Sequence, residues 1–279
     1  MIVHLLDGTY ELFRHYYGLQ RAKQHKRTLS AVAGLLRTVV QMLEEGATHL
    51  GVATDHVIES FRNSMWAEYK TGEGIEPALF SQFHPLEQAL ESMGVTVWPM
   101  VECEADDALA SAARIASGDP RVDVVKIWTP DKDLAQCVVH DRVVQVDRRS
   151  GVVRNAAAIR MKFGVDPVHI PDYLALVGDS ADGYPGMRGI GTKTAARLVN
   201  QYGSIEQFPS EILGKNRDLA LLFKKLATLR SDLPVFTDVE QLRWTGPRPC
   251  FATWEESLGD PALLSRVKKL TEIGIEQRR

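Results

Sequence analysis

The sequence predicts an α/β domain with a mostly parallel sheet, followed by a mainly helical lobe. In the first half, short apolar runs alternate with helical patterns at the spacing of strand–helix–strand units. From about Pro167 onward, the apolar residues recur only at helical spacing. The chain has 279 residues, 44% of them hydrophobic and 25% charged, which suits one large or two smaller globular domains. We therefore expect an α/β domain over residues 1–165 and a helical lobe over 166–279.

The elements of the first half can be placed in order. A helix over residues 30–46 would begin with Ser30 as N-cap and end at Gly46. Helices are also expected over about 77–93, ending before Gly94, and over the alanine-rich stretch 105–117. The expected strands cover residues 2–6, 49–54, 95–100 and 122–129, and a β-rich stretch covers 138–147.

The second half is read as helices joined by short turns. The expected helices cover residues 170–178, 191–203, 204–213, 216–230 and 261–274.

The cysteines and the N-terminus indicate a cytoplasmic protein. Cys103, Cys137 and Cys250 are odd in number and form no C-x-x-C pair, which argues for a reducing compartment and against a structural zinc site. The first apolar run is interrupted by His4 and Asp7 too soon for a signal peptide, and no run approaches membrane-spanning length.

Carboxylates gather at the ends of the predicted strands. The carboxyl ends of parallel strands share one edge of a sheet, so these side chains should meet there. Each acid alone has an ordinary explanation at a helix start or a turn. Together they would repel unless a divalent cation neutralises them, and an all-oxygen set suits Mg²⁺ or Mn²⁺, with enough ligands for two metals. The seven acids are Asp7, Asp55, Glu104, Asp106, Asp107, Asp131 and Asp133.

A glycine-rich segment over residues 174–199 adds two more acids, Asp179 and Asp182. It is not a P-loop, because the Gly-Thr-Lys that follows Gly186 is one residue out of register. It is not an EF-hand either, because position twelve counted from Asp179 is Ile190.

The pattern that fits this segment is helix, tight turn, helix. Gly189 and Gly191 would let the backbone approach a ligand, and the next helix would open with free N–H groups beside Lys193. Arg188 and Arg197 flank the turn. We expect a phosphate site that contacts the nucleic-acid backbone without reading sequence, and the alternative is a plain helical turn packed into the core.

The remaining charge supports a nucleic-acid ligand. The net charge is −3, so setting aside the nine acids leaves +6 on the rest of the chain. Basic residues cluster over 14–27, with Tyr16 and Tyr17 interleaved, and over 215–230. Basic stripes with aromatics suit single-stranded or junction nucleic acid, whereas a solvated surface remains the alternative for the second stripe.

These motifs together resemble the 5′-nuclease family, which includes flap endonucleases and the 5′→3′ exonuclease domain of bacterial DNA polymerase I. The match runs in order from Met1 to about Leu270 and leaves no chain for a polymerase domain, so the chain looks like a stand-alone nuclease. The matching motifs are DG (7–8), ATD (53–55), SFR (60–62), YK (69–70), ECEADDALA (102–110), TPDKDL (129–134) and VGDSADGYPGMRGIGTKTA (177–195).

The resemblance implies a PIN-like fold whose acids hold two or three divalent ions that activate water against a phosphodiester. Asp7, Asp55, Glu104 and Asp106 match the family's tighter group, and Asp107, Asp131, Asp133, Asp179 and Asp182 complete the set.

The resemblance also implies contacts to DNA. Lys70 would reach the scissile phosphate from a helical arch, with Arg62 and Arg14 near it, and Tyr10 would stack on a frayed base. A helix-hairpin-helix at about 185–200 would grip duplex phosphates, often with a K⁺ ion. Its expected DNA-binding residues are Arg188, Gly189, Gly191, Thr192, Lys193 and Thr194.

Two features depart from the family pattern. Residues 59–76 carry two basic side chains against Glu59, Glu68, Glu73 and Glu76, which suits an arch poorly for attracting phosphate. The residue after the last metal-binding aspartate is Gly183, where the family commonly has Asn.

The sequence thus predicts a monomeric, Mg²⁺- or Mn²⁺-dependent 5′ nuclease that cuts DNA near junctions between single strands and duplex. It would be a cytoplasmic protein of bacterial type, associated with the nucleoid. Two alternatives stay open: a PIN-like ribonuclease, which usually has about four acids and no Gly-Ile-Gly turn, and a junction-binding protein that has lost catalysis.

Overall fold

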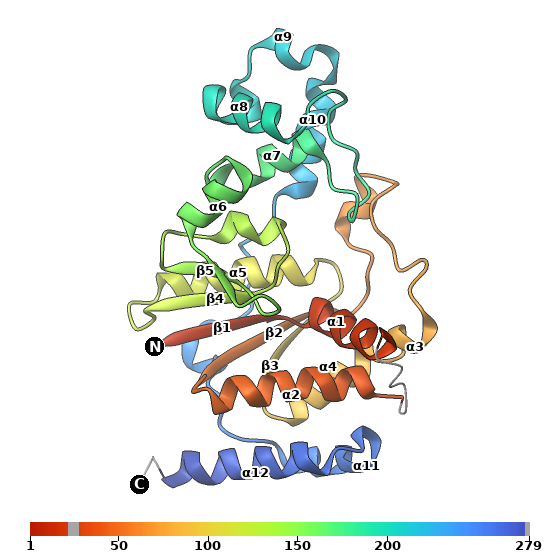
Figure 1. The fold of residues 1–279 in the computed structure, drawn as a ribbon, viewed down its shortest axis with the longest axis vertical. Coiled ribbons are helices and arrows are strands. Elements are labelled where there is room, and N and C mark those ends of the chain that lie inside the picture. The colour runs from red at the N-terminus through yellow and green to blue at the C-terminus, as the bar shows by residue number, and fades with distance from the viewer. Residues whose placement is uncertain (22–27, 277–279) are drawn as a thin grey trace.

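The computed structural model describes residues 1–21 and 28–276, and its centre is a six-stranded sheet with the order β3-β2-β1-β4-β5-β6 (Figure 1). The first five strands are parallel, and β6 pairs antiparallel with β5. This arrangement confirms the predicted mostly parallel α/β fold. The strands are β1 (Ile2–Asp7), β2 (His49–Asp55), β3 (Thr96–Met100), β4 (Val124–Trp128), β5 (Val143–Asp147) and β6 (Val152–Arg154).

Helices cover both faces of the sheet. Because side chains alternate along a strand, Leu6 packs into the cluster under α1 and α2, whereas Leu5 packs into the cluster under α5. The alanines of α5 let that helix lie close to the strands. The helices of this domain are α1 (Gly8–Arg21), α2 (Ser30–Glu44), α3 (Pro77–Phe80), α4 (Phe83–Ser92), α5 (Ala105–Gly118) and α6 (Ala156–Phe163).

The local predictions differ from the structure at three helices. Helix α1 is not among the elements expected from the sequence, although Leu12 and Tyr16 are buried at helical spacing. The predicted helix over 77–93 is interrupted between α3 and α4, where the buried Gln82 side chain accepts from the backbone N–H groups of Ala31 and Val32. Gln82 therefore caps α2 from outside, and Ser30 is the first residue of α2 instead of its N-cap.

The helical lobe lies at the top of Figure 1, above the side of the sheet formed by β4 and β5. It has its own apolar core, in which α7 packs against α8 and α10. Pro209 and Gly214 bracket α9, so the predicted helix over 204–213 is reduced to its last turn. The helices are α7 (Ile170–Val177), α8 (Thr192–Tyr202), α9 (Ser210–Leu213) and α10 (Arg217–Ala227).

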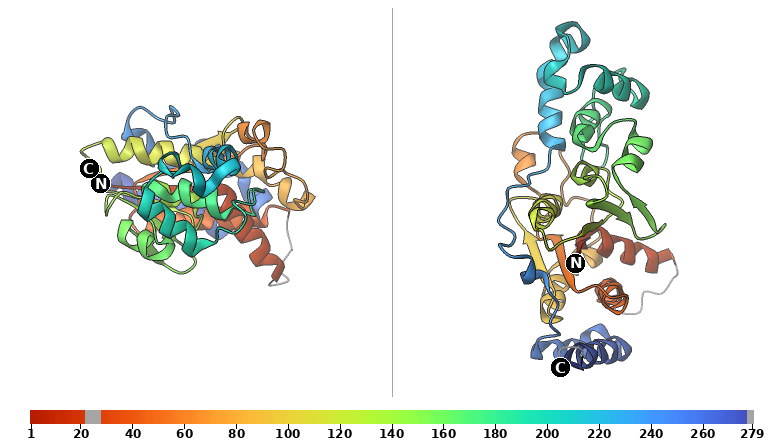
Figure 2. Two further views of the ribbon diagram at one scale, coloured as in Figure 1. Left: turned by 90° about the horizontal axis from the view of Figure 1, so that it is seen from above. Right: turned by 90° about the vertical axis from the view of Figure 1, so that its left-hand side faces the viewer.

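After α10 the chain returns to the α/β domain and ends on the opposite side of the sheet (Figure 2). Trp244 donates its backbone N–H to Thr48 O and its indole N–H to Met93 O. Helices α11 (Trp254–Leu258) and α12 (Pro261–Glu276) pack on α2. The last part of the lobe predicted over 166–279 therefore lies with the α/β domain, because its apolar side chains join the cluster around α2.

Across the described ranges, no helix is both long enough and apolar enough to span a membrane.

Candidate active site

The structure gathers the predicted strand-end acids along one edge of the sheet. Asp7 and Asp55 are the last residues of β1 and β2, and Asp131 follows β4. Glu104 is the N-cap of α5, and Asp106 lies in the first turn of that helix. The parallel order β2-β1-β4 brings these three strand ends side by side, as the sequence predicts. We call these five acids the acid rim.

Neighbouring polar groups hold two rim carboxylates in place. Asp7 accepts from the backbone N–H of Tyr10 and from Thr129 Oγ1, both at 2.9 Å. Asp55 accepts from the backbone N–H of Ala105 at 2.8 Å, which ties β2 to the start of α5. Each carboxylate is therefore anchored through part of its bonding capacity and can still accept a further ligand.

Burial raises the pKa values of three rim carboxyls, those of Asp7, Asp55 and Asp106. Burial raises the pKa of Asp7 to about 7, helped by the charges of Asp55 and Asp131 and opposed by its hydrogen bonds. Burial, with Asp131 and Asp7, likewise raises the pKa of Asp106 well above its ordinary value. Crowded carboxyls of this kind call for a positive counter-charge.

A second acid cluster lies beside the rim. Asp133, Asp179 and Asp182 are buried, and each offers a carboxylate oxygen within 4.8 Å of the others. The Oδ1 atom of Asp133 is buried and finds no hydrogen-bond partner among the described residues. An unpartnered carboxylate oxygen in a buried acidic cluster fits a bound cation.

Two lysines form ion pairs with carboxylates of the acid rim and of the second acid cluster. Lys70 Nζ lies 2.6 Å from Glu104 Oε2 and 3.3 Å from Asp182 Oδ1. Burial works against the charged form of Lys70, but these carboxylates raise its pKa well above the ordinary value. Lys132 Nζ lies 2.8 Å from Asp179 Oδ2.

The structure contradicts the expected roles of Arg62 and Asp107. Arg62 is only 1% exposed and grips Asp107 through two hydrogen bonds of 2.8 Å. It also donates to Glu104 Oε1 and to the carbonyls of Leu226 and Thr228. All five N–H donors of the guanidinium are thereby used, so Arg62 cannot reach a phosphate.

Asp107 is equally occupied. It also accepts from the backbone N–H groups of Glu104 and Arg230, at 3.0 and 2.8 Å. With every strong acceptor site used, Asp107 is a buried structural anchor and no ligand for a metal.

Residues 59–76, all of which the structure describes, do not form the expected helical arch. A single 3₁₀ turn covers Phe61–Ser64, and the following chain to Pro77 is irregular. This segment packs on the second acid cluster, since Trp66 Nε1 donates to Gly183 O and the Lys70 N–H donates to Asp182 O. Gly183 has φ +82°, and a Cβ there would lie 2.0 Å from Glu68 O. The glycine that departs from the family pattern thus permits this close contact.

The predicted phosphate-binding turn is exposed. Arg188, Gly189, Gly191, Thr192 and Lys193 are exposed, and Thr194 is half-buried. Gly189 has φ +83°, and α8 begins after Gly191 without a side-chain cap. The first helix of the expected hairpin, α7, ends well before this turn, so a long loop over residues 178–191 replaces a short helix-to-helix connection.

The remaining predicted residues lie on either side of the rim. Tyr10 is half-buried next to Asp7. Arg14 makes bonds of 2.5–3.1 Å to the buried Glu11 and lines a cavity on the α1–α2 side of the sheet. Within the 14–27 stripe, residues 22–27 lie outside the described part. In the 215–230 stripe, Lys224 is neutralised by Asp172 at 2.8 Å.

Several residues that hold the acids in place are not predicted from the sequence. Ser60 Oγ and Tyr69 OH donate to Glu104, at 2.7 and 3.3 Å. Thr129 and Lys132 contact the acids from within the motif TPDKD. Their position inside an acid motif was the available signal, but only the structure shows what they contact.

Comparison with known proteins decides the family. A model described as the 5′-3′ exonuclease N-terminal resolvase-like domain matches residues 2–164, and one for the 5′-3′ exonuclease C-terminal SAM fold matches residues 165–249. The chain belongs to the 5′-3′ exonuclease family.

Relatives and solved structures agree with this assignment. A 5′-3′ exonuclease of Aquifex aeolicus is 31% identical, over 97% of this chain and 96% of its own length. DNA polymerase I of Bacillus subtilis is also 31% identical, but the chain covers only 29% of it. T5 5′-exonuclease bound to zinc has a TM-score of 0.69 at 17% identity, covering 98% of this chain and all of that one. The catalytic core of Rad2 with a DNA substrate has a TM-score of 0.64 at 14% identity, covering 96% and 91%.

Proposed function

We propose that this member of the 5′-3′ exonuclease family is a divalent-metal-dependent, structure-selective 5′ nuclease that hydrolyses DNA near single-strand/duplex junctions. The observation that carries the proposal is the buried carboxylate cluster with an Asp133 oxygen that has no partner among the described residues, next to a rim in which burial raises the pKa of Asp106 well above its ordinary value. A protein does not assemble such a cluster for stability alone, because burying like charges is costly.

Two groups of side chains would hold the metals. Asp7, Asp55, Glu104, Asp106 and Asp131 would form one site, and Asp133, Asp179 and Asp182 the other. Their donor atoms are all oxygen, which suits Mg²⁺ or Mn²⁺. When bound, such ions supply Lewis-acid activation of water and stabilise the charge that develops on the phosphoryl oxygens.

The chain's own cations and turns would position the DNA. Lys70 sits between the rim and the second cluster, so it would bind the scissile phosphate when Glu104 and Asp182 are neutralised by other charges. The turn over residues 188–194 and the start of α8 would bind a backbone phosphate of the duplex, using exposed N–H groups and Lys193. Tyr10, next to Asp7, would stack on a base at the frayed end.

The two lobes would have different roles in the reaction. Residues 1–165 would hydrolyse the phosphodiester, and α7–α10 would bind the duplex. The ion predicted at the 188–194 turn is K⁺. Replacing K⁺ by tetramethylammonium at constant ionic strength should weaken duplex binding, whereas unchanged binding would remove K⁺ from the proposal.

The nuclease proposal is tested with 5′-labelled flap, nicked duplex, single-stranded DNA and RNA in Mg²⁺, Mn²⁺ or EDTA. We expect metal-dependent cleavage of DNA, reduced about 100-fold or more by Asp106→Ala. Asp166→Ala, which removes an exposed carboxylate paired with Arg160, is the matched control and should retain activity. Cleavage in EDTA, cleavage of RNA alone, or full activity in Asp106→Ala would each contradict the proposal.

A further inference from the structure

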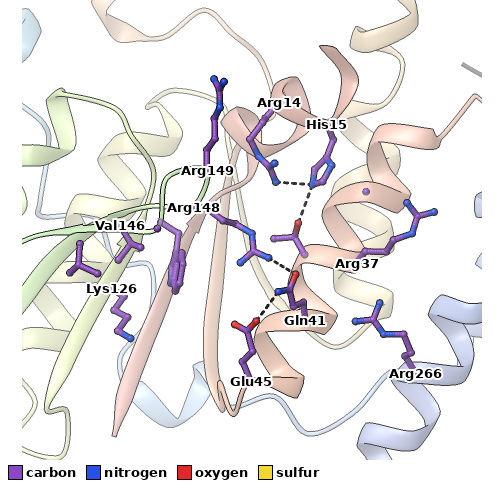
Figure 3. Close-up of a pocket in the computed structure, with 15 residues that line it drawn as sticks. Arg14, His15, Arg37, Gln41, Glu45, Lys126, Val146, Arg148, Arg149 and Arg266 are labelled. Carbon is purple, nitrogen blue, oxygen red and sulfur yellow. Dashed lines mark hydrogen bonds between the residues drawn. The ribbon is translucent and has the colours of Figure 1, made fainter. Parts of the chain in front are cut away.

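A basic groove lies on the α1–α2 side of the sheet, away from both acid clusters. It is a cavity of about 780 Å³ between α1, α2, β4, the β5–β6 hairpin and α12. Figure 3 shows Arg14 and Arg149 at one end of it, and Lys126 and Arg266 at the other. Six cations line this basic groove: Arg14, Arg37, Lys126, Arg148, Arg149 and Arg266.

Negative charge in the basic groove is scarce. Glu45 is the one carboxylate among the described lining residues. Arg14, Arg37 and Arg266 are paired with acids outside the lining, namely Glu11, Asp260 and Glu44. The structure thus holds these three guanidinium groups in fixed positions at the groove wall.

The other three cations have no such partner. In the described ranges, no carboxylate oxygen lies within 4.0 Å of the charged side-chain nitrogens of Lys126, Arg148 or Arg149. Arg148 donates instead to the neutral Gln41 Oε1 at 3.0 Å and lies 5.9 Å from the Trp128 ring centre. Figure 3 shows Arg148 reaching across the cavity toward Gln41 on α2. Lys126 and Arg148 are half-buried and Arg149 is exposed. Cations without a counter-charge at a groove wall favour an anionic ligand over an apolar one.

Burial and neighbouring charges shift the pKa values of two groups in the basic groove. Burial, with the charges of Arg14, Arg148 and Arg37, lowers the pKa of His15 to about 3. His15 is therefore neutral at pH 7 and adds nothing to the charge of the groove. Burial also lowers the pKa of Arg148, with Glu11 opposing and Arg14 adding to the effect.

The basic groove connects with the acid rim through consecutive residues. Trp128 lines the groove, and the next residue, Thr129, donates to Asp7 in the rim. On α1, Tyr10 lies beside Asp7, and Arg14 lies one turn later in the groove, an advance of about 6 Å along the helix axis. A strand that reaches the rim at Tyr10 can therefore continue into the groove.

We propose that the basic groove is a second phosphate site, which binds the backbone of a nucleic-acid strand extending beyond the acid rim. The cations are spread along the cavity from separate elements, which fits successive phosphates better than one compact anion. The Trp128 ring next to Arg148 adds a surface suited to a base or sugar. This site is separate from the 188–194 turn, which lies in the helical lobe.

The test measures binding without cleavage. Fluorescence anisotropy of a labelled single-stranded oligonucleotide in EDTA is compared between the natural protein and Lys126→Gln/Arg148→Gln. At 0.1 M salt, each lost contact weakens binding about fivefold, so the double variant should bind about 25-fold more weakly. The slope of log affinity against log salt should fall by about 1.4. Arg114→Gln/Arg243→Gln removes the same charge from exposed positions on other surfaces and should change affinity by less than about twofold.

Each outcome decides the proposal. Unchanged affinity and slope in Lys126→Gln/Arg148→Gln, with a normal unfolding curve, would overturn it. Calorimetry with tripolyphosphate distinguishes a nucleic-acid strand from a free oligophosphate as the ligand. If Lys126→Gln/Arg148→Gln lost tripolyphosphate binding but kept its affinity for the strand, the groove would be a site for a free oligophosphate, and the strand proposal would be overturned. Because EDTA suppresses metal-dependent cleavage, the result does not depend on whether the acid rim hydrolyses DNA.

Discussion

Replacing Arg62 with Met should destabilise the protein strongly. Arg62 is 1% exposed and neutralises Asp107, itself fully buried, through two bonds of 2.8 Å. Met has a similar reach but no charge, so the variant leaves the Asp107 carboxylate buried without its counter-ion and Glu104 with one donor fewer. Removing one partner of a buried pair costs about 3–5 kcal/mol, and we expect the free energy of unfolding to fall by that amount.

The same substitution should weaken the link between the two lobes. Arg62 donates to the carbonyls of Leu226 and Thr228, where α10 ends and the chain returns to the sheet. Those carbonyls would lose their partners in the variant, which adds to the cost. Protease sensitivity near residue 228 should therefore rise together with the loss of stability.

The assay is urea unfolding followed by circular dichroism, with two comparison variants. Arg243→Met removes an exposed arginine bound to Glu240 and should cost less than about 1 kcal/mol. Adding Asp107→Asn to Arg62→Met removes the unpaired charge while an amide oxygen can still accept from the Arg230 N–H, so part of the stability should return. A loss below about 1 kcal/mol in Arg62→Met, or no recovery in the double variant, would refute this account of the buried pair.

Three further predictions concern the acid rim and the segment beside it. Gly183→Asn restores the family's residue but places a side chain against Glu68 O at φ +82°, so the free energy of unfolding in urea should fall by more than about 2 kcal/mol. Gly189→Asn, at φ +83° in open space, should lower it by about 1 kcal/mol. Equal losses in the two variants would contradict the steric explanation. Burial raises the pKa of Asp7 from 3.8 to about 7, so the folded protein retains a proton that the unfolded chain releases, and the stability in EDTA should fall as the pH rises from about 4 to about 7. Mn²⁺ should reduce that fall in thermal-denaturation scans, and identical pH profiles with and without Mn²⁺ would argue against a metal at the rim. Glu73→Arg, at an exposed position of the 59–76 segment, should tighten flap binding in anisotropy, and no change would mean that this segment does not contact the strand.

Part of the site could be predicted because it depends on local order along the chain. Asp7, Asp55 and Asp131 each follow an apolar run, and parallel strands bring their carboxyl ends to one edge whatever the rest of the molecule does. The exposed turn after Gly189 is likewise encoded locally, by glycines and by a helix that starts without a cap. These residues lie where the sequence predicts.

Other residues took roles that no local pattern records. The matching motifs predict Arg62 near the scissile phosphate and Asp107 as a metal ligand. In the structure they pair with each other across 45 residues of sequence, and Arg62 also contacts Thr228, 166 residues away. The helix expected near Lys70 is absent because Trp66 and Gly183 hold that segment against the second acid cluster. Such contacts depend on which distant segments pack together.

The sequence alone is enough to predict the parallel sheet, the acids at its edge and the glycine turn before α8, because apolar periodicity and residue type act over a few neighbouring positions. Only tertiary packing determines which charged side chains are buried in ion pairs and which are available to bind a ligand. It buried Arg62 with Asp107, and it set Lys70 between Glu104 and Asp182. It also brought Arg37, Lys126, Arg148 and Arg266 from four separate elements to one groove. The availability of a charge depends on its burial and its partners, and both are properties of the packed chain.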